Sequence, residues 1–307
     1  MMIPTGELIK RLRKESGLTQ EQLAEGVCTR LTITRIEQGK VEPNYFTKWR
    51  ILQKLGKNPA LYIADTVSDR EAQILRLGDR LYDLHAKKQY DVLEAELREV
   101  QGTELFSQGE GLRVLLNAEG NLHLGRKEFD EAIECFTRSI LLLRPDFDLN
   151  KVTEYCLSDG EMRSILNIAA THLARHDFEK SIGILRNLKK HEQFMYAENR
   201  TDSHTLNVIN YNYVSCLYGL GGYFECLTEC EKALDTAFET TDMVIFAAYL
   251  KGIALCKLRL GHDDAEEASD RYRAFLRGMG GEDLLAYKLR EFETLVGEVA
   301  IELKTNT

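Results

Sequence analysis

Two groups of residues carry polar side chains that could recognise a partner through hydrogen bonds. The first group lies in residues 29–40, where Arg30 and Arg35 stand among threonines. A guanidinium presents five donors in a planar fork, which matches phosphate oxygens or the edge of a guanine. The second group is a set of asparagines, among which Asn167 and Asn212 have similar sequence surroundings. An asparagine amide offers both a donor and an acceptor to a peptide backbone.

The sequence lacks common signatures of catalysis, because it contains no HExxH, GxGxxG or P-loop motif. His172 and His176 have the i, i+4 spacing of metal ligands on a helix, but no third ligand accompanies them and His172 falls at a packing position. Cys226 and Cys230 lie one helical turn apart and are better explained as buried thiols. We therefore expect no enzyme activity, no metal and no other cofactor.

Cysteine usage and hydropathy indicate a cytoplasmic protein. The 307 residues include 7 cysteines, an odd number, and no CxxC pair. This pattern favours free thiols in a reducing compartment over a disulfide framework. No apolar run approaches the roughly 20 residues of a membrane helix, and the N-terminus does not have the form of a secretory signal. We expect no contact with a membrane.

Charge is unevenly distributed along the chain. Residues 1–57 contain 11 lysines and arginines and 6 acidic residues, whereas the whole chain has a net charge of -9. The first segment therefore carries about +5 and the remainder about −14. An asymmetry of this size suggests that the N-terminal segment meets a polyanion and that the rest of the chain does not.

The N-terminal segment has clear signals for short helices. Thr19 and Gln22 form the pattern of a capping box, which begins one helix. Thr29 is suited to cap the next helix, and Gly39 stands where a left-handed residue would end it. A tight turn between these two helices is the layout of a helix-turn-helix. The five predicted helical segments are about 5–16, a short helix from Gln20, 30–38, 44–55 with Phe46, Trp49, Ile51, Leu52 and Leu55 as its apolar residues, and a turn near 58–64.

The stretch "LTQEQLAEGVCTRLTITRIEQGKVEP", residues 18–43, resembles the Cro/C1-type (XRE-type) helix-turn-helix of phage repressors. This resemblance implies that the third helix enters the major groove of DNA and that Arg13 and Glu37 pair inside the domain. The residues expected to face base edges are Thr29, Arg30, Leu31, Thr34 and Arg35, and those expected at phosphates are Gln20, Thr32, Lys40 and Asn44.

A second pattern recurs in the acidic remainder. An aromatic–acidic pair follows a polar turn and precedes a small or apolar position, as in "RKEFDEAIECF", residues 126–136. Tetratricopeptide repeats have small positions of this kind, and residues 69–280 resemble them. Long connections are expected near 146–161 and 191–206, and a last helix over about 281–304 is expected to cap the array or to dimerise. The small positions are Leu93, Ala132, Ser181, Cys226 and Ala265, spaced 39 to 49 residues apart.

Stacked helix pairs of this type form a right-handed solenoid whose inner helices line a groove suited to an extended peptide. Asn167, Asn212 and Lys251 fall at matching places in successive repeats. The residues expected to bind a peptide are Asn117, Asn121, Arg163, Asn167, Tyr211, Asn212, Tyr218 and Lys251.

The order of the two parts, a helix-turn-helix domain at 1–65 and a tetratricopeptide-like domain at 66–307, resembles the RRNPP family of quorum-sensing regulators from Gram-positive bacteria. The resemblance implies an all-α, homodimeric, cytoplasmic transcriptional regulator that binds a palindromic operator in double-stranded DNA. It also implies that a short signalling peptide binds the repeats and alters operator binding, with residues 56–70 as the hinge. Two alternatives remain open: repeats that dock a partner protein, and a phage arbitrium receptor controlling lysis or lysogeny. A third, a role in binding a phosphatase or response regulator, is disfavoured by the intact helix-turn-helix.

Overall fold

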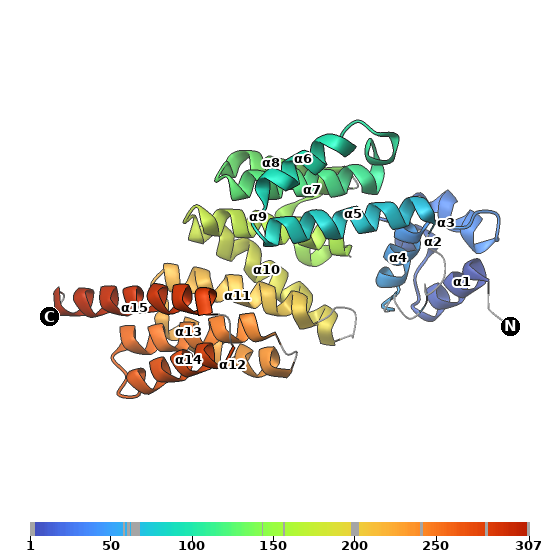
Figure 1. Ribbon diagram of the computed structural model, residues 1–307. Helices are drawn as coiled ribbons and strands as arrows, with labels where there is room; N and C mark the ends of the chain where they lie inside the picture. Colours follow the sequence, from blue (N-terminus) through green and yellow to red (C-terminus); the bar gives the residue numbers. More distant parts are fainter. Residues whose placement is uncertain are drawn as a thin grey trace. The chain divides into compact units, whose positions relative to one another are not determined.

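The protein is built from α-helices in two compact units (Figure 1). The computed structural model describes residues 4–57, 59, 62, 68–142, 144–155, 157–197, 203–239, 242–279 and 282–305, and within these ranges it contains no strand. The first unit comprises residues up to 171 together with 193–201, and the second comprises 172–192 and 202–307. The predicted all-α class is confirmed. Within the described ranges, no helix combines the length and the apolarity needed to cross a membrane.

Four short helices form the N-terminal head, residues 4–57 of the first unit: α1 (Thr5–Glu15), α2 (Gln20–Ala24), α3 (Arg30–Glu37) and α4 (Tyr45–Lys54). The predicted capping box is present, because the Thr19 hydroxyl accepts the Gln22 N–H at 3.1 Å and the Gln22 side chain accepts the Thr19 N–H at 2.8 Å. Gly39 has a φ of 68°, the left-handed conformation that ends α3. Of the predicted turn near 58–64 the structure describes only Pro59 and Tyr62, and there the Tyr62 N–H donates to the Pro59 carbonyl at 2.9 Å. The boundary at 65 and most of the hinge over 56–70 lie outside the described residues.

One apolar core holds the head together. Helices of this length are marginal alone, so their stability comes from packing their apolar faces. Each Leu or Ile side chain that is fully buried contributes about 1.5–3 kcal/mol. Leu18, Val27, Tyr45 and Trp49 pack around the core while remaining partly exposed. The buried residues of the core are Ile9, Leu12, Leu23, Ala24, Ile33, Ile36, Ile51, Leu52 and Leu55.

The rest of the first unit consists of longer helices that pack as pairs. A second apolar core lies among α5, α6 and α7, and Phe46 from the head packs against it. The predicted long connection near 146–161 is present as the segment between α8 and α9, which contains the 3₁₀ helix η3 (Leu149–Glu154). The helices are α5 (Asp69–Ala86), α6 (Tyr90–Val100), α7 (Gly109–Gly125), α8 (Phe129–Leu141) and α9 (Asp159–Ala174), with the 3₁₀ helix η2 (Glu104–Phe106) between α6 and α7.

The second unit is organised around one central helix, α13 (Met243–Leu260), which packs against the helices on either side of it in the sequence. The predicted last helix corresponds to α15, which lies on α13 and α14 and buries Phe292 against the Tyr272 ring at a centroid distance of 4.7 Å. Its capping or dimerising role remains a prediction. The other helices are α10 (Phe178–Ala197), α11 (Ser203–Gly219), α12 (Tyr223–Glu239), α14 (Ala265–Met279) and α15 (Glu282–Thr305).

In its first four copies, the recurring sequence pattern marks the same local structure. A residue with positive φ ends one helix, and the aromatic residue two positions later begins the second helix of the pair. All five predicted small positions are buried, as a closely packed helix pair requires. In the first four copies, the residues with positive φ are Lys88, Lys127, His176 and Gly221, with φ of 57°, 62°, 64° and 75°.

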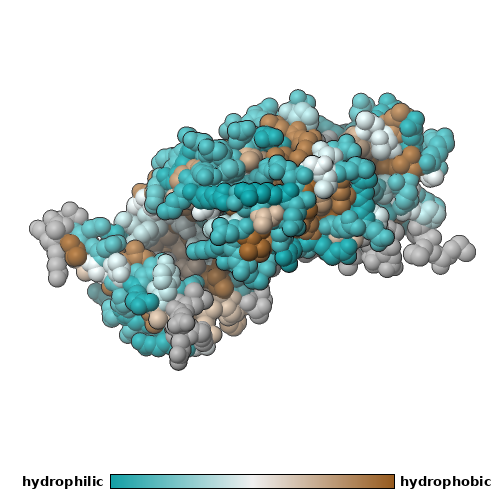
Figure 2. Space-filling view, turned by 45° about the horizontal axis from the view of Figure 1, so that its top comes forward, coloured by the Kyte–Doolittle hydropathy of each residue, from teal (hydrophilic) through white to brown (hydrophobic). Residues whose placement is uncertain are grey.

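The visible surface is mostly hydrophilic, with hydrophobic residues gathered in separate patches (Figure 2). In the second unit, Phe224, Phe238 and Ile301 are among the most exposed apolar side chains. Single exposed apolar residues are normal on globular proteins.

Backbone strain at the repeat turn gives a testable prediction. Gly221→Ala is expected to lower the free energy of unfolding by about 1 kcal/mol, because alanine is strained at this positive φ although nothing stands within 4 Å of its β-carbon. The matched control is Gly183→Ala, inside α10, where the space is equally open. This substitution is expected to stabilise the protein by about 0.5–1 kcal/mol through helix propensity. Urea unfolding followed by circular dichroism measures both, and effects of the same sign would contradict the interpretation.

Candidate nucleic-acid interface and ligand cavity

The outer face of α3 presents the residues expected to read DNA. Thr29 caps the helix by accepting the Thr32 N–H at 3.2 Å. Arg30 and Arg35 are exposed, and neither forms an ion pair with another described residue. Leu31 is also exposed, with 57% of its surface accessible. The arrangement leaves two guanidinium groups and one apolar side chain available to a partner.

The residues expected at phosphates also bind within the head. The Gln20 amide donates to Glu37 Oε2 at 2.8 Å and accepts the Thr34 hydroxyl at 3.0 Å. Asn44 caps α4 by accepting the Thr47 N–H at 2.8 Å. Thr32 lies 2.9 Å from the Thr29 hydroxyl, and Lys40 is exposed. Gln20 and Asn44 therefore position helices whether or not they also contact phosphate.

Arg13 and Glu37 form the pair that the resemblance implied. Arg13 Nε and Nη2 donate to the two Glu37 carboxylate oxygens at 2.5 and 3.0 Å, and Arg13 Nη1 donates to the Leu18 carbonyl at 2.8 Å. The two side chains are 12% and 2% exposed. Burial alone would raise the pKa of Glu37, but the hydrogen bonds from Arg13 and Gln20 outweigh it, and the net pKa is lowered. This bidentate pair joins α1 to the end of α3 and so fixes the angle of α3.

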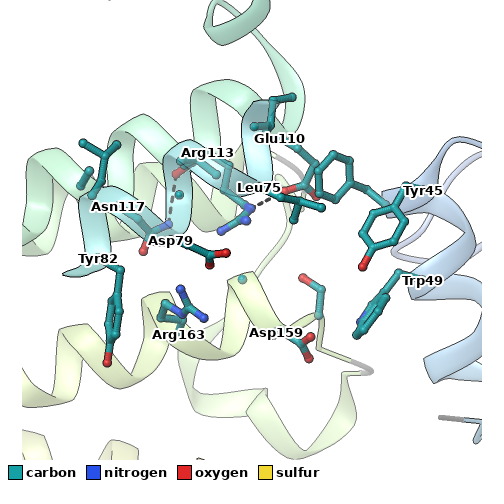
Figure 3. Close-up of a pocket in the computed structure, with 18 of the residues that line it drawn as sticks. Tyr45, Trp49, Leu75, Asp79, Tyr82, Glu110, Arg113, Asn117, Asp159 and Arg163 are labelled. Atoms are coloured by element: carbon teal, nitrogen blue, oxygen red, sulfur yellow. Dashed lines mark hydrogen bonds and ion pairs between the residues drawn. The ribbon is translucent and has the colours of Figure 1, made fainter. Parts of the chain in front are cut away.

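A cavity of about 220 Å³ lies behind the head, where α4 meets α5, α7 and α9 (Figure 3). Residues of α4, α5 and α7 and of the start of α9 supply its walls, and all of its lining residues belong to the first unit. From α4, Tyr45 and Trp49 point toward the cavity, opposite Asp159 and Arg163 of α9 (Figure 3). The remaining labelled lining residues are Leu75, Asp79 and Tyr82 of α5 and Glu110, Arg113 and Asn117 of α7.

Helix α4 belongs to two apolar cores at once. Tyr45 and Trp49 pack against the head core, whereas Phe46 packs against the core of α5–α7. The Tyr45 ring lies 5.4 Å from that of Phe46 and 5.6 Å from that of Trp49. From sequence, Phe46 is expected only as one more apolar residue of the fourth helix of the head. In the structure, Phe46 packs instead against the repeats, because α4 has an apolar surface on two sides.

Polar bonds reinforce this junction. The Tyr45 N–H donates to Glu71 Oε1 at 2.5 Å, which links the first turns of α4 and α5. Arg50 Nη2 donates to Glu110 Oε1 at 2.5 Å, and Gln53 Nε2 donates to Asp159 Oδ1 at 2.8 Å. Three repeat helices are thereby tied to one helix of the head.

The turn between α2 and α3 is also covered by a repeat side chain. Arg144 follows α8, and its Nη2 lies 3.5 Å from the Gly26 carbonyl oxygen. A β-carbon at Gly26 would lie 2.2 Å from the Arg144 guanidinium, and Gly26 has a positive φ of 69°. The positive φ favours glycine at this position, and a β-carbon here would require the Arg144 side chain to shift.

Four of the residues expected to bind a peptide come together in the first unit. Asn117, Asn121 and Arg163 line the cavity, and Asn167 Nδ2 donates to Asn121 Oδ1 at 3.2 Å. Asn117 accepts the Ser164 hydroxyl at 3.0 Å. These contacts join α7 to α9, so the asparagines have a structural role in addition to the predicted one.

The other four residues lie in the second unit, on α11 and α13. Tyr211 is exposed, whereas Asn212 is buried and donates to the Val208 carbonyl at 3.1 Å. Tyr218 lies 3.5 Å from Arg259 Nε. Lys251 forms an ion pair with Glu291 of α15. In this state Asn212 and Lys251 are engaged within the unit, and their peptide contacts remain a prediction.

Most of the cavity wall was not predicted from the sequence. Tyr45, Trp49 and Arg50 were not proposed as site residues, nor were Glu110 and Asp159. One signal was available: "YFTKWR", residues 45–50, places three aromatic residues in one short helix, more than a single core face needs.

Residues 9–62 match a family described as helix-turn-helix. An uncharacterized HTH-type transcriptional regulator of Methanothermobacter thermautotrophicus is 49% identical over 51 residues, which are 16% of this chain and 74% of that protein. The family match covers the N-terminal part of the chain, which contains α3.

Two solved structures share the fold over almost the whole chain. Bacillus thuringiensis PlcR, solved in complex with the peptide PapR7 and DNA, has a TM-score of 0.57 at 18% identity, covering 95% of this chain and 99% of PlcR. A Rap protein complexed with the Competence and Sporulation Factor has a TM-score of 0.55 at 14% identity, covering 98% of this chain and 87% of that one. The predicted order, a helix-turn-helix followed by helical repeats, is confirmed.

The Arg13–Glu37 pair gives a prediction with a defined pH dependence. At neutral pH, Arg13→Leu is expected to lower the free energy of unfolding by about 3 kcal/mol, because it leaves a buried carboxylate without its partner. The lowered pKa of Glu37 means that the pair stabilises the head above the unfolded pKa of about 4.3, and that this stabilisation is lost as the pH falls through the folded pKa.

The destabilisation by Arg13→Leu should therefore shrink as the pH is lowered from about 7 to about 3. Urea unfolding at a series of pH values measures it. Arg11→Leu, at an exposed position of the same helix, is the matched control and should change stability by less than about 0.5 kcal/mol. A destabilisation by Arg13→Leu that is independent of pH would contradict this role for the pair.

Proposed function

The chain belongs to the helix-turn-helix family of transcriptional regulators, and from that premise we propose that it is a cytoplasmic regulator that binds a specific operator through α3. The observation that carries the proposal is the outer face of α3, where Arg30 and Arg35 are exposed without ion-pair partners among the described residues. Arginine is the side chain that most often reads guanine, through its O6 and N7 atoms. Leu31 is suited to contact a thymine methyl group.

Rigidity of α3 supports the same proposal. Base readout needs side chains held in one register by a stiff support. The buried Arg13–Glu37 pair and the Gln20 amide hold the end and the middle of α3 against α1 and α2. The N-terminal turn of α3, which carries Arg30 and Leu31, is left open. We propose that a homodimer places two such helices on half-sites about 34 Å apart, or a multiple of that distance, in a palindromic operator.

We further propose that the repeats bind a short signalling peptide. Support comes from Asn121 of α7, which lines the cavity, and from Asn167 of α9, which donates a hydrogen bond to it. The fold is shared with PlcR, which was solved with both a peptide and DNA. A peptide alters operator binding only by the difference in its affinity for the two states of the protein. The bonds between α4 and the repeats are the contacts that such a peptide would change.

Substitutions on α3 test the DNA proposal. Arg30→Ala and Arg35→Ala are each expected to weaken binding to the operator by about 10- to 100-fold and to reduce discrimination between sequences. Lys40→Ala should weaken binding to all sequences about equally and lower the salt slope by about 1. Fluorescence anisotropy on a duplex selected from a random pool measures these changes. Arg11→Ala removes the same charge from α1 and is expected to change the affinity less than about 3-fold. Wild-type affinity in both α3 variants would reject the proposed interface.

Operator affinity with and without peptide tests the second proposal. The probes are synthetic peptides of five to ten residues taken from the C-terminus of a small secreted product encoded beside the gene. The cognate peptide is expected to shift operator affinity about 5- to 150-fold, the usual range of allosteric coupling. Asn167→Ala should abolish the shift and leave peptide-free DNA binding unchanged, whereas Asn150→Ala, an exposed control on η3, should preserve both. No effect of any such peptide on affinity or footprint would reject peptide control and leave the DNA proposal intact.

A further inference from the structure

The cavity behind the head has features of a binding site for one aromatic residue. Its volume of about 220 Å³ lies below the ~300–1,000 Å³ of pockets for drug-sized ligands. At about 30 Å³ for each water, it has room for about seven waters, which suits one side chain with its backbone atoms. Tyr45, Phe46, Trp49 and Tyr82 supply aromatic surface on its walls. Aromatic walls favour an aromatic guest through offset or edge-to-face contact.

One wall presents a hydrogen-bond donor without a partner. Trp49 Nε1 is buried and makes no hydrogen bond within the described structure. The indole N–H donates only, and leaving a buried donor unsatisfied costs about 1–3 kcal/mol. The Tyr45 hydroxyl points into the same space (Figure 3). Burial, and then the negative charges of Asp159 and Glu71, raise the pKa of the Tyr45 phenol, so this group keeps its proton. The Trp49 indole N–H and the Tyr45 hydroxyl are therefore both available to donate a hydrogen bond to a ligand.

The charges of the cavity are not all compensated by ion pairs. Glu110 is shared between Arg50 and Arg113, each at 2.5 Å. Arg163 lies over the Tyr82 ring at 5.0 Å and has no carboxylate partner among the described residues. Asp79 also lines the cavity and has no basic partner among them. Arg163 and Asp79 both flank the same space from α9 and α5 (Figure 3). One cation and one anion are thus available to a guest.

We propose that this cavity binds an aromatic amino-acid unit whose α-carboxylate meets Arg163 and whose ring lies against Tyr45 and Trp49. Asp79 then accepts the N–H of the α-nitrogen, and the indole N–H of Trp49 donates to an oxygen of the guest. Two sources share this chemistry: the carboxy-terminal residue of a peptide, and a free aromatic amino acid. The inference deepens the proposed peptide binding and rests on it for the first source. Asn121 and Asn167, which continue from the cavity along α7 and α9, favour the peptide.

Occupancy of this cavity bears directly on the head. Tyr45, Trp49 and Arg50 belong to α4, which also contributes to the head core. If α4 can adopt two positions, a guest that packs against it binds the protein with different affinity in each. This difference in affinity shifts the population toward the position that binds the guest more tightly. The cavity is therefore placed to connect a ligand with the DNA-binding surface without a long chain of intermediate contacts.

Trp49 is the single tryptophan of the chain, so its fluorescence reports occupancy directly. The full-length protein is titrated with N-acetyl-L-phenylalanine, its amide and N-acetyl-L-alanine, with selective excitation of tryptophan, and affinities are confirmed by calorimetry. The phenylalanine acid is expected to give a saturable spectral change, the amide to bind at least 10-fold more weakly, and the alanine derivative to give no change. Arg163→Gln should reduce the affinity for the acid to that for the amide. Arg138→Gln, an exposed arginine on α8, is the matched control and should have no effect.

The source is decided by comparing L-phenylalanine with an alanine-rich heptapeptide that ends in phenylalanine. Binding of the heptapeptide at least 10-fold tighter assigns the cavity to a peptide terminus, and the opposite order assigns it to a free amino acid. The proposal is overturned by the absence of a saturable change at millimolar probe, by equal affinities for acid and amide, or by an Arg163→Gln variant that binds like the wild type. If a cognate peptide nevertheless shifts operator affinity, the proposed function stands and only this site is rejected.

Discussion

The double packing of α4 is the constraint on which the rest of the first unit depends. Phe46 lies in the core of α5–α7, while Tyr45 and Trp49 lie against the core of the head. A single rigid helix cannot keep both contacts if the head rotates on the repeats, because protein interiors are packed too closely to deform continuously. Any other orientation of the head therefore requires one of the two contacts to separate. We therefore expect the junction to behave as a two-state element rather than as a flexible tether.

Polar groups at the junction make its two states sensitive to partners. Arg50, Glu110 and Arg113 form a charged cluster in which each side chain is about one-eighth exposed. Separating such groups leaves buried charges without partners, which is costly unless water or a ligand replaces the lost bonds. A ligand in the adjacent cavity lies close enough to compensate them. Arg50 lies on α4, which shares the head core with α3 and its exposed arginines.

Local features of the molecule were predictable from sequence, and long-range contacts were not. The capping box at Thr19, the left-handed Gly39 and the five buried small positions follow from short-range patterns. The Arg13–Glu37 pair could be predicted only from the family resemblance, because the two residues are 24 positions apart in the sequence. The bonds from Arg50 to Glu110 and from Gln53 to Asp159 join residues 60 and 106 positions apart. Such pairs depend on how the head docks, which no local propensity encodes.

Hydrogen exchange with and without a selected operator duplex tests most directly whether the head and the first repeats act as one unit. Coupling between two sites is reciprocal, so a change at the DNA surface must also appear at the cavity. Operator binding is predicted to slow exchange at the amides of α5 and α7 together with those of α3 and α4. Slower exchange confined to the head, with α5 and α7 unchanged, would contradict the coupling through α4.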